Sequence, residues 1–261
     1  MISLFGSAQS DREWEKFGAR EPYFGVYSNT RFLRRRLNDD TLVEFFASGE
    51  TFVANAMAEA RRYFDFDPHG KIALDFGCGV GRLSLPLARR FSQVLASDIS
   101  PSMLAELQAN CERRAVSNVL TLKDDGTLAA LQNHRFDFLL SAEVLQHIPR
   151  KRGLKILSRL IDRLQPGGLA VVEFPYAVSI GTARHALQVA RRYIPGLHWV
   201  ANVAKGRPLD WPFAETLAYP LNEIMMLLGR HGVTHVHCII ARGRRVDQLR
   251  LLFQRNASGP A

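Results

Sequence analysis

The sequence predicts an open, doubly wound α/β fold with a seven-stranded, mostly parallel sheet. Short apolar runs alternate with helical segments between residues 71 and 174, which is the rhythm of parallel strands joined by crossover helices. The runs are apolar at successive positions, as expected of strands that helices cover on both faces. The first run ends in a cluster of glycines, at the turn where such sheets commonly bind a ligand.

Residues 1–66 precede this pattern and are mainly helical in character. Apolar residues recur at helical spacing over residues 51–63. Asp67, Pro68 and Gly70 then interrupt the pattern, because neither proline nor glycine readily continues a helix. We therefore expect an N-terminal helical cap over residues 1–66.

Seven strands are expected along the rest of the chain, five of them before residue 175 and two at the C-terminal end. They are residues 71–76, 94–98, 119–122, 136–140, 169–174, 235–241 and 248–254. The helices expected between them are residues 82–91, 102–114, 150–164 and 221–231. The last two strands flank the short turn 242–245, so we expect them to form an antiparallel hairpin.

Residues 175–220 depart from the alternation of strands and helices. They hold Trp199 and Trp211, two of the three tryptophans, and residues 182–194 have one apolar helix face with arginines off it. We interpret residues 175–220 as a substrate-lid insertion. The core would then consist of residues 67–174 and 221–261.

The composition is that of an ordinary globular protein: of 261 residues, 47% are hydrophobic and 23% charged. It excludes a disordered, collagen-like or fibrous chain, and no apolar run approaches the roughly 20 residues that span a bilayer. The N-terminal segment lacks a basic start followed by an apolar core, so we expect no secretory signal. Cys78, Cys111 and Cys238 are odd in number and widely spaced, which favours free thiols in a cytoplasmic protein and no zinc site.

The formal net charge of +9 is concentrated in the last third of the chain. The net charge is −2 over residues 1–69, +4 over residues 70–174 and +7 over residues 175–261. Such a basic surface attracts nucleic acid, an anionic membrane or an acidic small molecule. The alternative is a solvated face without a partner.

The segment with the most chemical information is the glycine-rich turn after the first strand. Gly77, Gly79 and Gly81 follow a strand and precede a helix, and Asp75 stands two residues ahead of them. Without Cβ atoms the backbone can turn tightly while a ligand packs against it. A dinucleotide fingerprint needs its third glycine at position 82, where this chain has Arg82. The pattern therefore counts against a nicotinamide enzyme.

Asp98 ends the second strand, 21 residues after Gly77. An acid at that position of a doubly wound sheet can accept hydrogen bonds from both hydroxyls of a ribose. The alternative is an aspartate that only caps the strand. The glycine-rich turn at this spacing favours the ribose role.

These motifs together resemble the class I S-adenosylmethionine-dependent methyltransferases. The resemblance covers residues 70–174 and, more weakly, residues 221–254, and its motifs occur in the family's order. They are Leu74–Gly81, Ser97–Ser100, Asp124–Gly126, Phe136–Phe138, Val144–Ile148 and Leu164–Gly168. The resemblance implies a Rossmann-like fold and S-adenosyl-L-methionine as the cofactor.

The resemblance also implies roles for residues of the first two turns. The glycine-rich turn, including Cys78, would pass along the methionine part of the cofactor, and Asp75 would face its amino group. Asp98 would hold the ribose hydroxyls, and Ile99 would lie against the adenine. Because the sulfonium and ammonium groups are cationic, acids around the pocket suit this ligand.

Further roles are implied beyond the third and fourth strands. Asp125 would accept a hydrogen bond from the adenine amino group and Gly126 would offer its backbone amide, with Asp124 as the competing choice. Ser141 would use its backbone near the methionine amino group.

A general base is needed if the acceptor is an oxygen nucleophile. His147 is the first candidate because it follows the fourth strand near the expected edge of the cofactor, and Glu143 is the second. The structural alternative is that His147 fixes a helix start or packs behind the pocket.

The expected acceptor is a small molecule. Methyltransferases of base amino groups carry Asn/Asp-Pro-Pro-aromatic after the fourth strand, whereas residues 141–144 here read Ser-Ala-Glu-Val. The insertion would bind an anionic or glycosylated acceptor, such as a natural product, a sugar or a lipid-linked glycan at a peripheral membrane contact. The alternative is that its helix packs on the sheet or on a second subunit. The other hypotheses are an RNA-binding methyltransferase and a non-catalytic cofactor-binding protein.

Overall fold

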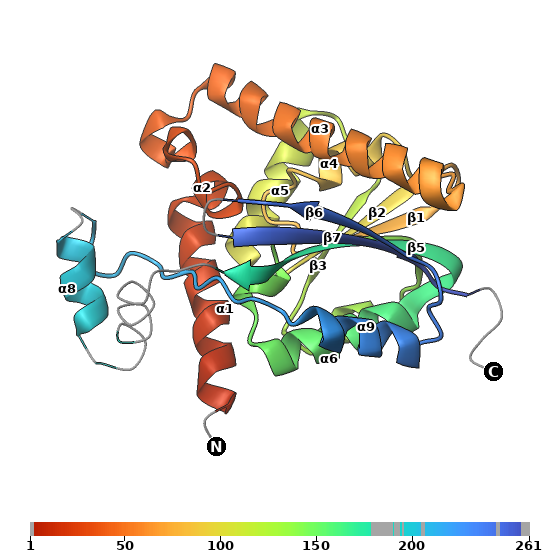
Figure 1. Cartoon of the computed structure of the whole chain (residues 1–261). Helices are drawn as coiled ribbons and strands as arrows, with labels where there is room; N and C mark the ends of the chain where they lie inside the picture. Colours follow the sequence, from red (N-terminus) through yellow and green to blue (C-terminus); the bar gives the residue numbers. More distant parts are fainter. Residues whose placement is uncertain are drawn as a thin grey trace.

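Strand β1 (Ile72–Phe76) lies at the centre of a seven-stranded sheet of order β3-β2-β1-β4-β5-β7-β6 in the computed structural model (Figure 1). The structure describes residues 3–178, 190, 194, 196–204, 207–243 and 246–256, with side chains from residue 10 onward except that of residue 198. The predicted fold class, a seven-stranded and mostly parallel Rossmann-like sheet, is confirmed.

The first five strands are parallel to one another, and β7 runs antiparallel to both of its neighbours, β5 and the edge strand β6. The remaining strands are β2 (Gln93–Asp98), β3 (Val119–Lys123), β4 (Phe136–Ala142), β5 (Leu164–Val178), β6 (Val236–Ala241) and β7 (Val246–Gln254). Strand β5 is longer than expected because it pairs with β7 as far as Val178. The predicted C-terminal hairpin is present as β6 and β7.

Helices cover both faces of the sheet. One face carries α3 (Asp39–Phe64), α4 (Ser84–Ala88) and α5 (Pro101–Arg113), and the other carries α6 (Arg150–Arg163) and α9 (Leu221–Arg230) (Figure 1). Adjacent residues of one strand point to opposite faces, so Ala73 joins the first layer and Leu74 the second. Helix α4 is shorter than the predicted 82–91, because Pro86 is tolerated only in a first turn.

The N-terminal region is helical, as predicted. It consists of α1 (Ser3–Arg20), α2 (Pro22–Val26), the short 3-10 helices η1 (Thr30–Phe32) and η2 (Arg34–Arg36), and α3. Asn38 caps α3 by accepting a hydrogen bond from the Thr41 amide, and the Thr41 hydroxyl accepts from the Asn38 amide in return. Phe17 and Tyr23 pack with Phe45 in a separate buried cluster, which joins α1 and α2 to α3.

Two further 3-10 turns and one short helix complete the described elements. They are η3 (Ala129–Leu131), η4 (Leu145–His147) and, in the insertion, α8 (Leu197–Val203). The predicted helix at residues 182–194 lies almost wholly outside the described residues, with Arg184, Arg191 and Arg192.

The insertion returns to the core at Tyr219. This side chain is fully buried, and its hydroxyl donates a hydrogen bond to the Ile148 carbonyl at 2.8 Å. The division of the chain into cap, core and lid insertion remains a proposal. Strand β5 continues four residues beyond the expected boundary at 174. No helix in the described part of the chain has the length and apolar character needed to cross a bilayer.

Replacing Gly49 with alanine should destabilise the protein. Gly49 lies inside α3, where an added Cβ would overlap the backbone carbonyl of Arg82, so the helix would have to move off the glycine-rich turn. We expect Gly49→Ala to lower the free energy of unfolding by about 1–3 kcal/mol in chemical denaturation. Gly229→Ala in α9 is the matched control: its Cβ meets open space, so stability should rise by about 0.5–1 kcal/mol. Equal effects of the two substitutions would contradict this packing argument.

Candidate functional site

A cavity of about 390 Å³ opens at the carboxyl ends of β1, β2 and β4. This is the edge at which doubly wound sheets bind ligands, and the volume lies within the range of small-molecule sites. Its floor comes from the glycine-rich turn and from the ends of these strands. Its remaining walls come mainly from the helical elements between residues 10 and 28, from residues 144–156 after β4, and from Ala214 and Thr216 of the insertion.

The glycine-rich turn forms the floor of the cavity, and at two of its positions a residue with a side chain would not fit. Gly77 and Gly79 have φ angles of 78° and 53°, in the left-handed region. A Cβ on Gly77 would overlap the side chain of Val144, and one on Gly79 would overlap Val26. Both glycines and Cys78 line the cavity, whereas Gly81 is absent from the lining and packs against Leu107 behind it.

Asp75 is a buried carboxyl at the end of β1. It is 2% exposed, and the Ser84 hydroxyl donates a hydrogen bond to its Oδ2 at 2.6 Å. Burial raises its pKa to about 7, an effect that Ser84 and the nearby Arg82 oppose. A cation in the cavity would therefore stabilise the ionised form of Asp75.

Asp98 joins the end of β2 to the glycine-rich turn. Its Oδ2 accepts a hydrogen bond from the Gly79 amide at 2.8 Å, and its Oδ1 accepts one from the Ser100 amide at 2.9 Å. Burial raises its pKa to about 6, although these backbone hydrogen bonds favour the ionised form. Asp98 and the following Ile99 both line the cavity, as the sequence led us to expect.

Of the two neighbouring acids after β3, the structure brings Asp124 to the cavity. Asp124 is buried in the lining and accepts hydrogen bonds from the amides of Asp125 and Leu128, at 2.8 and 3.0 Å. The Asp125 carboxylate is exposed and accepts from the amide and hydroxyl of Thr127, because it closes its own turn. Gly126 is absent from the lining as well: a Cβ there would overlap the guanidinium of Arg152.

Ser141 lies in β4, just behind the cavity wall. It pairs with Val172 of β5, is 2% exposed and is not part of the lining. The next residues along the chain, Ala142 and Glu143, do line the cavity. The end of β4 thus reaches the site one residue later than expected.

Glu143 faces the cavity from a strained backbone position. Its φ angle of 60° is unusual for a residue with a side chain, and such strain is concentrated at functional sites. The side chain can be reached from the cavity, yet protein surrounds it, and this burial raises its pKa. Arg82 acts in the opposite direction. A carboxylate with a raised pKa is a better proton acceptor than an ordinary one.

His147 also lines the cavity, but both of its ring nitrogens are engaged. Nδ1 lies 2.7 Å from the carbonyl oxygen of Glu215, to which it must donate, and Nε2 lies 3.1 Å from Nε2 of Gln146. Burial lowers the pKa of His147 to about 4. A proton-accepting role would require the bond from Gln146 to break, so the geometry favours the alternative in which His147 has a structural role.

Arg82 is a site residue whose importance sequence reasoning missed. From the sequence, Arg82 was significant only as the residue that stands in place of the third glycine of a dinucleotide fingerprint. Its side chain is 8% exposed, lines the cavity, and has an Nε without a hydrogen-bond partner. The guanidinium lies 5.5 Å from the ring centre of Tyr27 and 5.8 Å from that of Phe52. A polar residue directly after a buried glycine turn was the available signal.

Helix α1 supplies the second set of residues that the sequence did not indicate. Ser10 and Asp11 lie about one helical turn before Trp14, and all three residues line the cavity. The Arg152 guanidinium donates to both Asp11 oxygens, at 2.8 and 3.0 Å. The Trp14 ring lies 4.8 Å from that of His147. No local signal marks these residues, because their partners lie more than 130 positions away in the sequence.

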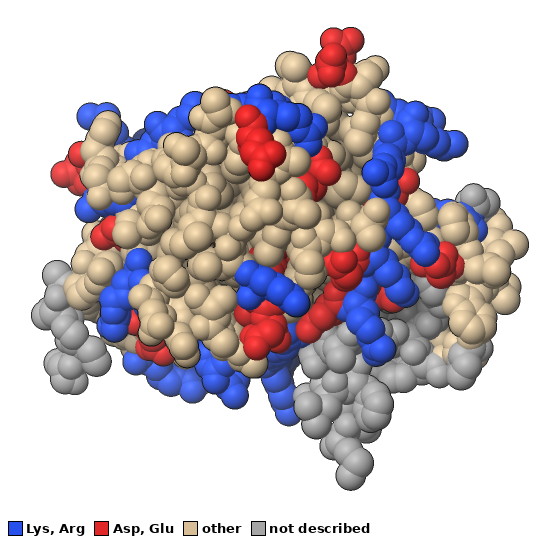
Figure 2. All heavy atoms as spheres, turned by 180° about the vertical axis from the view of Figure 1, so that it is seen from behind, with Lys and Arg blue, Asp and Glu red and all other residues tan. Residues whose placement is uncertain are grey.

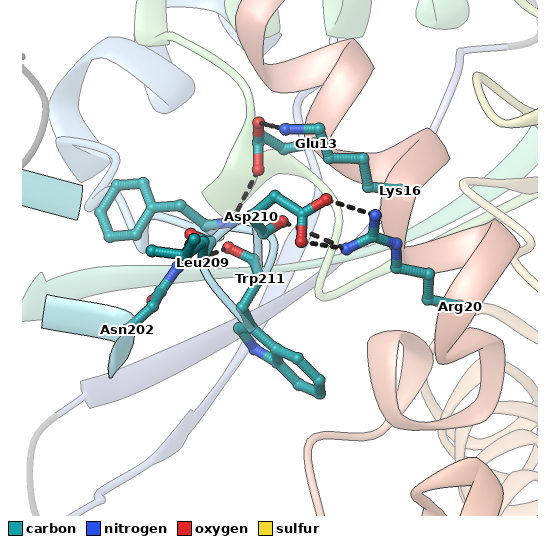
Figure 3. A network of polar contacts seen from close by, with 8 residues as sticks. Glu13, Lys16, Arg20, Asn202, Leu209, Asp210 and Trp211 are labelled. Carbon is teal, nitrogen blue, oxygen red and sulfur yellow. Dashed lines mark hydrogen bonds and ion pairs between the residues drawn. The ribbon is translucent and has the colours of Figure 1, made fainter. Parts of the chain in front are cut away.

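The insertion contributes the last wall. Ala214 and Thr216 line the cavity, and the segment before them is attached to α1 (Figure 3). The Arg20 guanidinium forms a two-pronged ion pair with Asp210, and the Glu13 carboxylate accepts a hydrogen bond from the Phe213 amide at 2.9 Å. The insertion and α1 therefore close the cavity together.

Comparison with known sequences relates the chain to methyltransferases. The profile of a family described as "Methyltransferase domain" matches residues 73–168. An uncharacterized methyltransferase of Mycobacterium bovis is 35% identical over 161 residues, which are 59% of this chain and 76% of the relative. A ubiquinone biosynthesis O-methyltransferase of Cereibacter sphaeroides is 34% identical over 101 residues, 38% of each chain.

Solved structures share the fold at low sequence identity. Magnesium protoporphyrin IX methyltransferase from Synechocystis, with bound SAH, has a TM-score of 0.58 and 19% identity, and the match covers 98% of each chain. The N-methyltransferase NodS from Bradyrhizobium japonicum, in complex with S-adenosyl-L-homocysteine, also has a TM-score of 0.58, at 16% identity. That match covers 95% of this chain and 98% of NodS.

The environment of His147 should make stability depend on pH. Its pKa is about 4 in the folded protein and about 6.5 in an unfolded chain, so the unfolded state binds its proton first. This contribution is complete above pH 6.5 and declines as the pH falls towards 4. At pH 5 it amounts to a loss of about 2 kcal/mol. The difference in free energy of unfolding between the wild type and His147→Gln, from urea titrations, should therefore shrink between pH 7.5 and 5. A difference that stays constant with pH would refute the buried, neutral imidazole.

Proposed function

The chain belongs to the class I S-adenosylmethionine-dependent methyltransferases, and from this premise we propose that it methylates a small-molecule acceptor bound in the same cavity as the cofactor. One observation carries the proposal. The glycine-rich turn, Asp75, Asp98 and Glu143 all line one cavity. Cofactor and acceptor therefore have room to meet between them.

The lining suits S-adenosylmethionine, the cofactor of this family. Three carboxyl groups, those of Asp75, Asp98 and Asp124, border the cavity and complement the positive sulfonium and ammonium groups. In our proposal Asp75 faces the amino group, Asp98 holds the ribose hydroxyls and Asp124 takes the place expected of Asp125 at the adenine. Arg82 supplies a positive charge for the carboxylate of the methionine part.

The remaining cofactor contacts are assigned to the floor of the cavity. Gly77, Cys78 and Gly79 lie along the methionine part, and Ile99 lies against the adenine. Gly81, Gly126 and Ser141 support these contacts from behind. The bound cofactor supplies a methyl group that is open to displacement at carbon.

The protein's own contribution to transfer is alignment, exclusion of water and removal of a proton. The rings of Trp14 and His147 are in contact in the wall of the cavity, and the hydrogen bonds of His147 with Gln146 and the Glu215 carbonyl keep the imidazole in one orientation. Holding the reactants in line lowers the barrier by several kcal/mol. We propose that Glu143 accepts the proton of an acceptor hydroxyl or amine, because it faces the cavity with no competing hydrogen bond of the kind that occupies His147.

The nature of the acceptor follows from the walls that the insertion provides. By their names, the relatives act on small molecules, such as a ubiquinone precursor or magnesium protoporphyrin IX. The insertion carries Trp211 three residues before the lining residue Ala214, and the guanidinium of Arg207 lies 5.4 Å from the centre of the Trp211 ring. Cationic and aromatic groups suit an anionic or glycosylated acceptor. The free thiols of Cys78, Cys111 and Cys238 suit a cytoplasmic enzyme.

An RNA substrate receives less support. On the face shown in Figure 2, Lys and Arg lie mainly around the outline, and acidic side chains are interspersed among them. A nucleic-acid groove instead needs a continuous basic track.

Asp98→Ala should abolish cofactor binding. The substitution removes the proposed ribose acceptor and also the bond to the Gly79 amide, so S-adenosylhomocysteine should no longer raise the melting temperature in a thermal-shift assay. Asp125→Ala should keep the full shift, because the Asp125 carboxylate lies outside the cavity lining. Loss of the shift in Asp125→Ala alone would restore Asp125 as the adenine contact and remove Asp124.

Glu143→Gln should separate binding from transfer. With tritiated-methyl cofactor and a small-molecule extract of the cells that make the protein, the rate of label transfer should fall by a factor of about 10²–10⁴. The thermal shift with S-adenosylhomocysteine should remain, since the amide keeps the size of the carboxylate. If even the wild type binds the cofactor but labels nothing in any extract, the protein is a non-catalytic cofactor-binding protein and the proposal fails.

A further inference from the structure

Helix α8 presents an apolar face to solvent. Trp199, Val200 and Val203 share one side of the helix, and their exposed fractions are 58%, 65% and 57%. Leu209, in the loop that follows, is 59% exposed. Figure 1 shows α8 outside the α/β body, beyond α1. Single exposed apolar residues are common, but a cluster of this kind marks an interaction surface.

The sequence on either side of α8 carries only positive charge as far as Asp210, whose carboxylate is paired with Arg20. Between Glu173 and Asp210 the sequence has no acidic residue. The Lys and Arg residues of this interval are Arg184, Arg191, Arg192, Lys205 and Arg207. The interval thus combines a tryptophan-bearing apolar helix with an uninterrupted basic stretch.

We propose that the face formed by Trp199, Val200 and Val203 docks the protein on an anionic lipid surface. Interfacial binding needs apolar side chains that enter the acyl boundary, a tryptophan at headgroup level and cations that neutralise acidic headgroups. This interval provides all three. A nucleic acid fits less well, because Val200 and Val203 offer nothing to a phosphate backbone or to a stacked base.

The docking face is firmly attached to the rest of the protein. The Asn202 side chain, on another side of α8, is fully buried and donates to the carbonyls of Leu209 and Trp211 at 2.9 and 3.1 Å (Figure 3). The adjoining Asp210 is paired with Arg20 of α1. These contacts fix α8 to the loop that follows it, and they fix this loop to α1.

The same loop leads directly into the cavity. Ala214 and Thr216 line it, only a few residues after Trp211, whose ring lies 6.0 Å from that of Phe24. A lipid surface bound by α8 therefore lies next to the wall through which the insertion closes the site. This consequence rests on the proposed function: the acceptor class becomes an amphiphile that is drawn from the lipid surface.

Vesicle sedimentation tests the docking. The full-length protein should sediment with vesicles of mixed phosphatidylglycerol and phosphatidylcholine but not with pure phosphatidylcholine, and about 0.5 M salt should release it. Trp199→Ser combined with Val203→Ser should weaken the binding about tenfold or more. Met226→Ser is the control, because Met226 is an equally exposed apolar residue, at 63%, on α9.

Tryptophan fluorescence locates the contact independently. On addition of the anionic vesicles, the emission of the wild type should shift to shorter wavelength as an indole leaves water. Trp199→Phe should lose this shift while it keeps its sedimentation within about twofold, since phenylalanine also enters the interface. A blue shift that persists without Trp199 would place the contact elsewhere and overturn the assignment to α8.

The remaining outcomes separate this inference from the proposed function. If the wild type fails to bind anionic vesicles, or if the double variant binds as well as Met226→Ser, docking through α8 is refuted. If an RNA oligonucleotide binds more tightly than the vesicles and displaces them, the basic stretch serves nucleic acid instead. In each case the thermal shift with S-adenosylhomocysteine is measured on the same variants, and an intact shift leaves the methyltransferase proposal standing.

Discussion

The site depends on the attachment of the glycine-rich turn to the end of β2. The amides of Gly77 and Cys78 donate to the carbonyl of Ser97 at 2.8 and 3.1 Å, and the Gly79 amide donates to the Asp98 carboxylate at 2.8 Å. These buried hydrogen bonds bring the turn close to two acids whose pKa values are raised by burial, to about 7 for Asp75 and about 6 for Asp98. A cationic ligand favours the ionised form of both carboxyls, so the floor of the cavity is prepared for positive charge before any ligand binds.

The walls that α1 and the insertion form are held by contacts of a different kind from those of the floor. The floor consists of backbone hydrogen bonds and buried glycines. In contrast, the ion pair Arg20–Asp210 joins α1 to the insertion and the ion pair Asp11–Arg152 joins α1 to α6, and water reaches both pairs. Exposed ion pairs contribute up to about 1 kcal/mol each. Separating the insertion from α1 at Asp210 therefore costs less than disturbing the floor, which suits an enzyme that must admit an acceptor and release its product.

Local sequence signals located the residues whose roles depend on their own strand or turn. Gly77, Asp98 and Ile99 reached the cavity as expected, because a glycine turn and a strand end define their own geometry. The choice between Asp124 and Asp125 was beyond reach, since it depends on which carboxylate closes the turn at Thr127 and which accepts from Leu128. His147 likewise drew attention as a base, and only its carbonyl partner at Glu215, 68 residues away, revealed that its proton is committed.

The sequence by itself determined the sheet, the order of its elements and the acidic, glycine-lined floor, because periodicity and turn chemistry act over a few neighbouring residues. It also determined where the positive charge lies along the chain. Only the tertiary structure decided what closes the cavity: α1 and residues 214–216 meet over the ends of β1, β2 and β4 through contacts between segments far apart in sequence. It also decided that Arg82 is buried in the cavity lining and that the apolar face of α8 is left in solvent, since burial depends on which distant elements pack together.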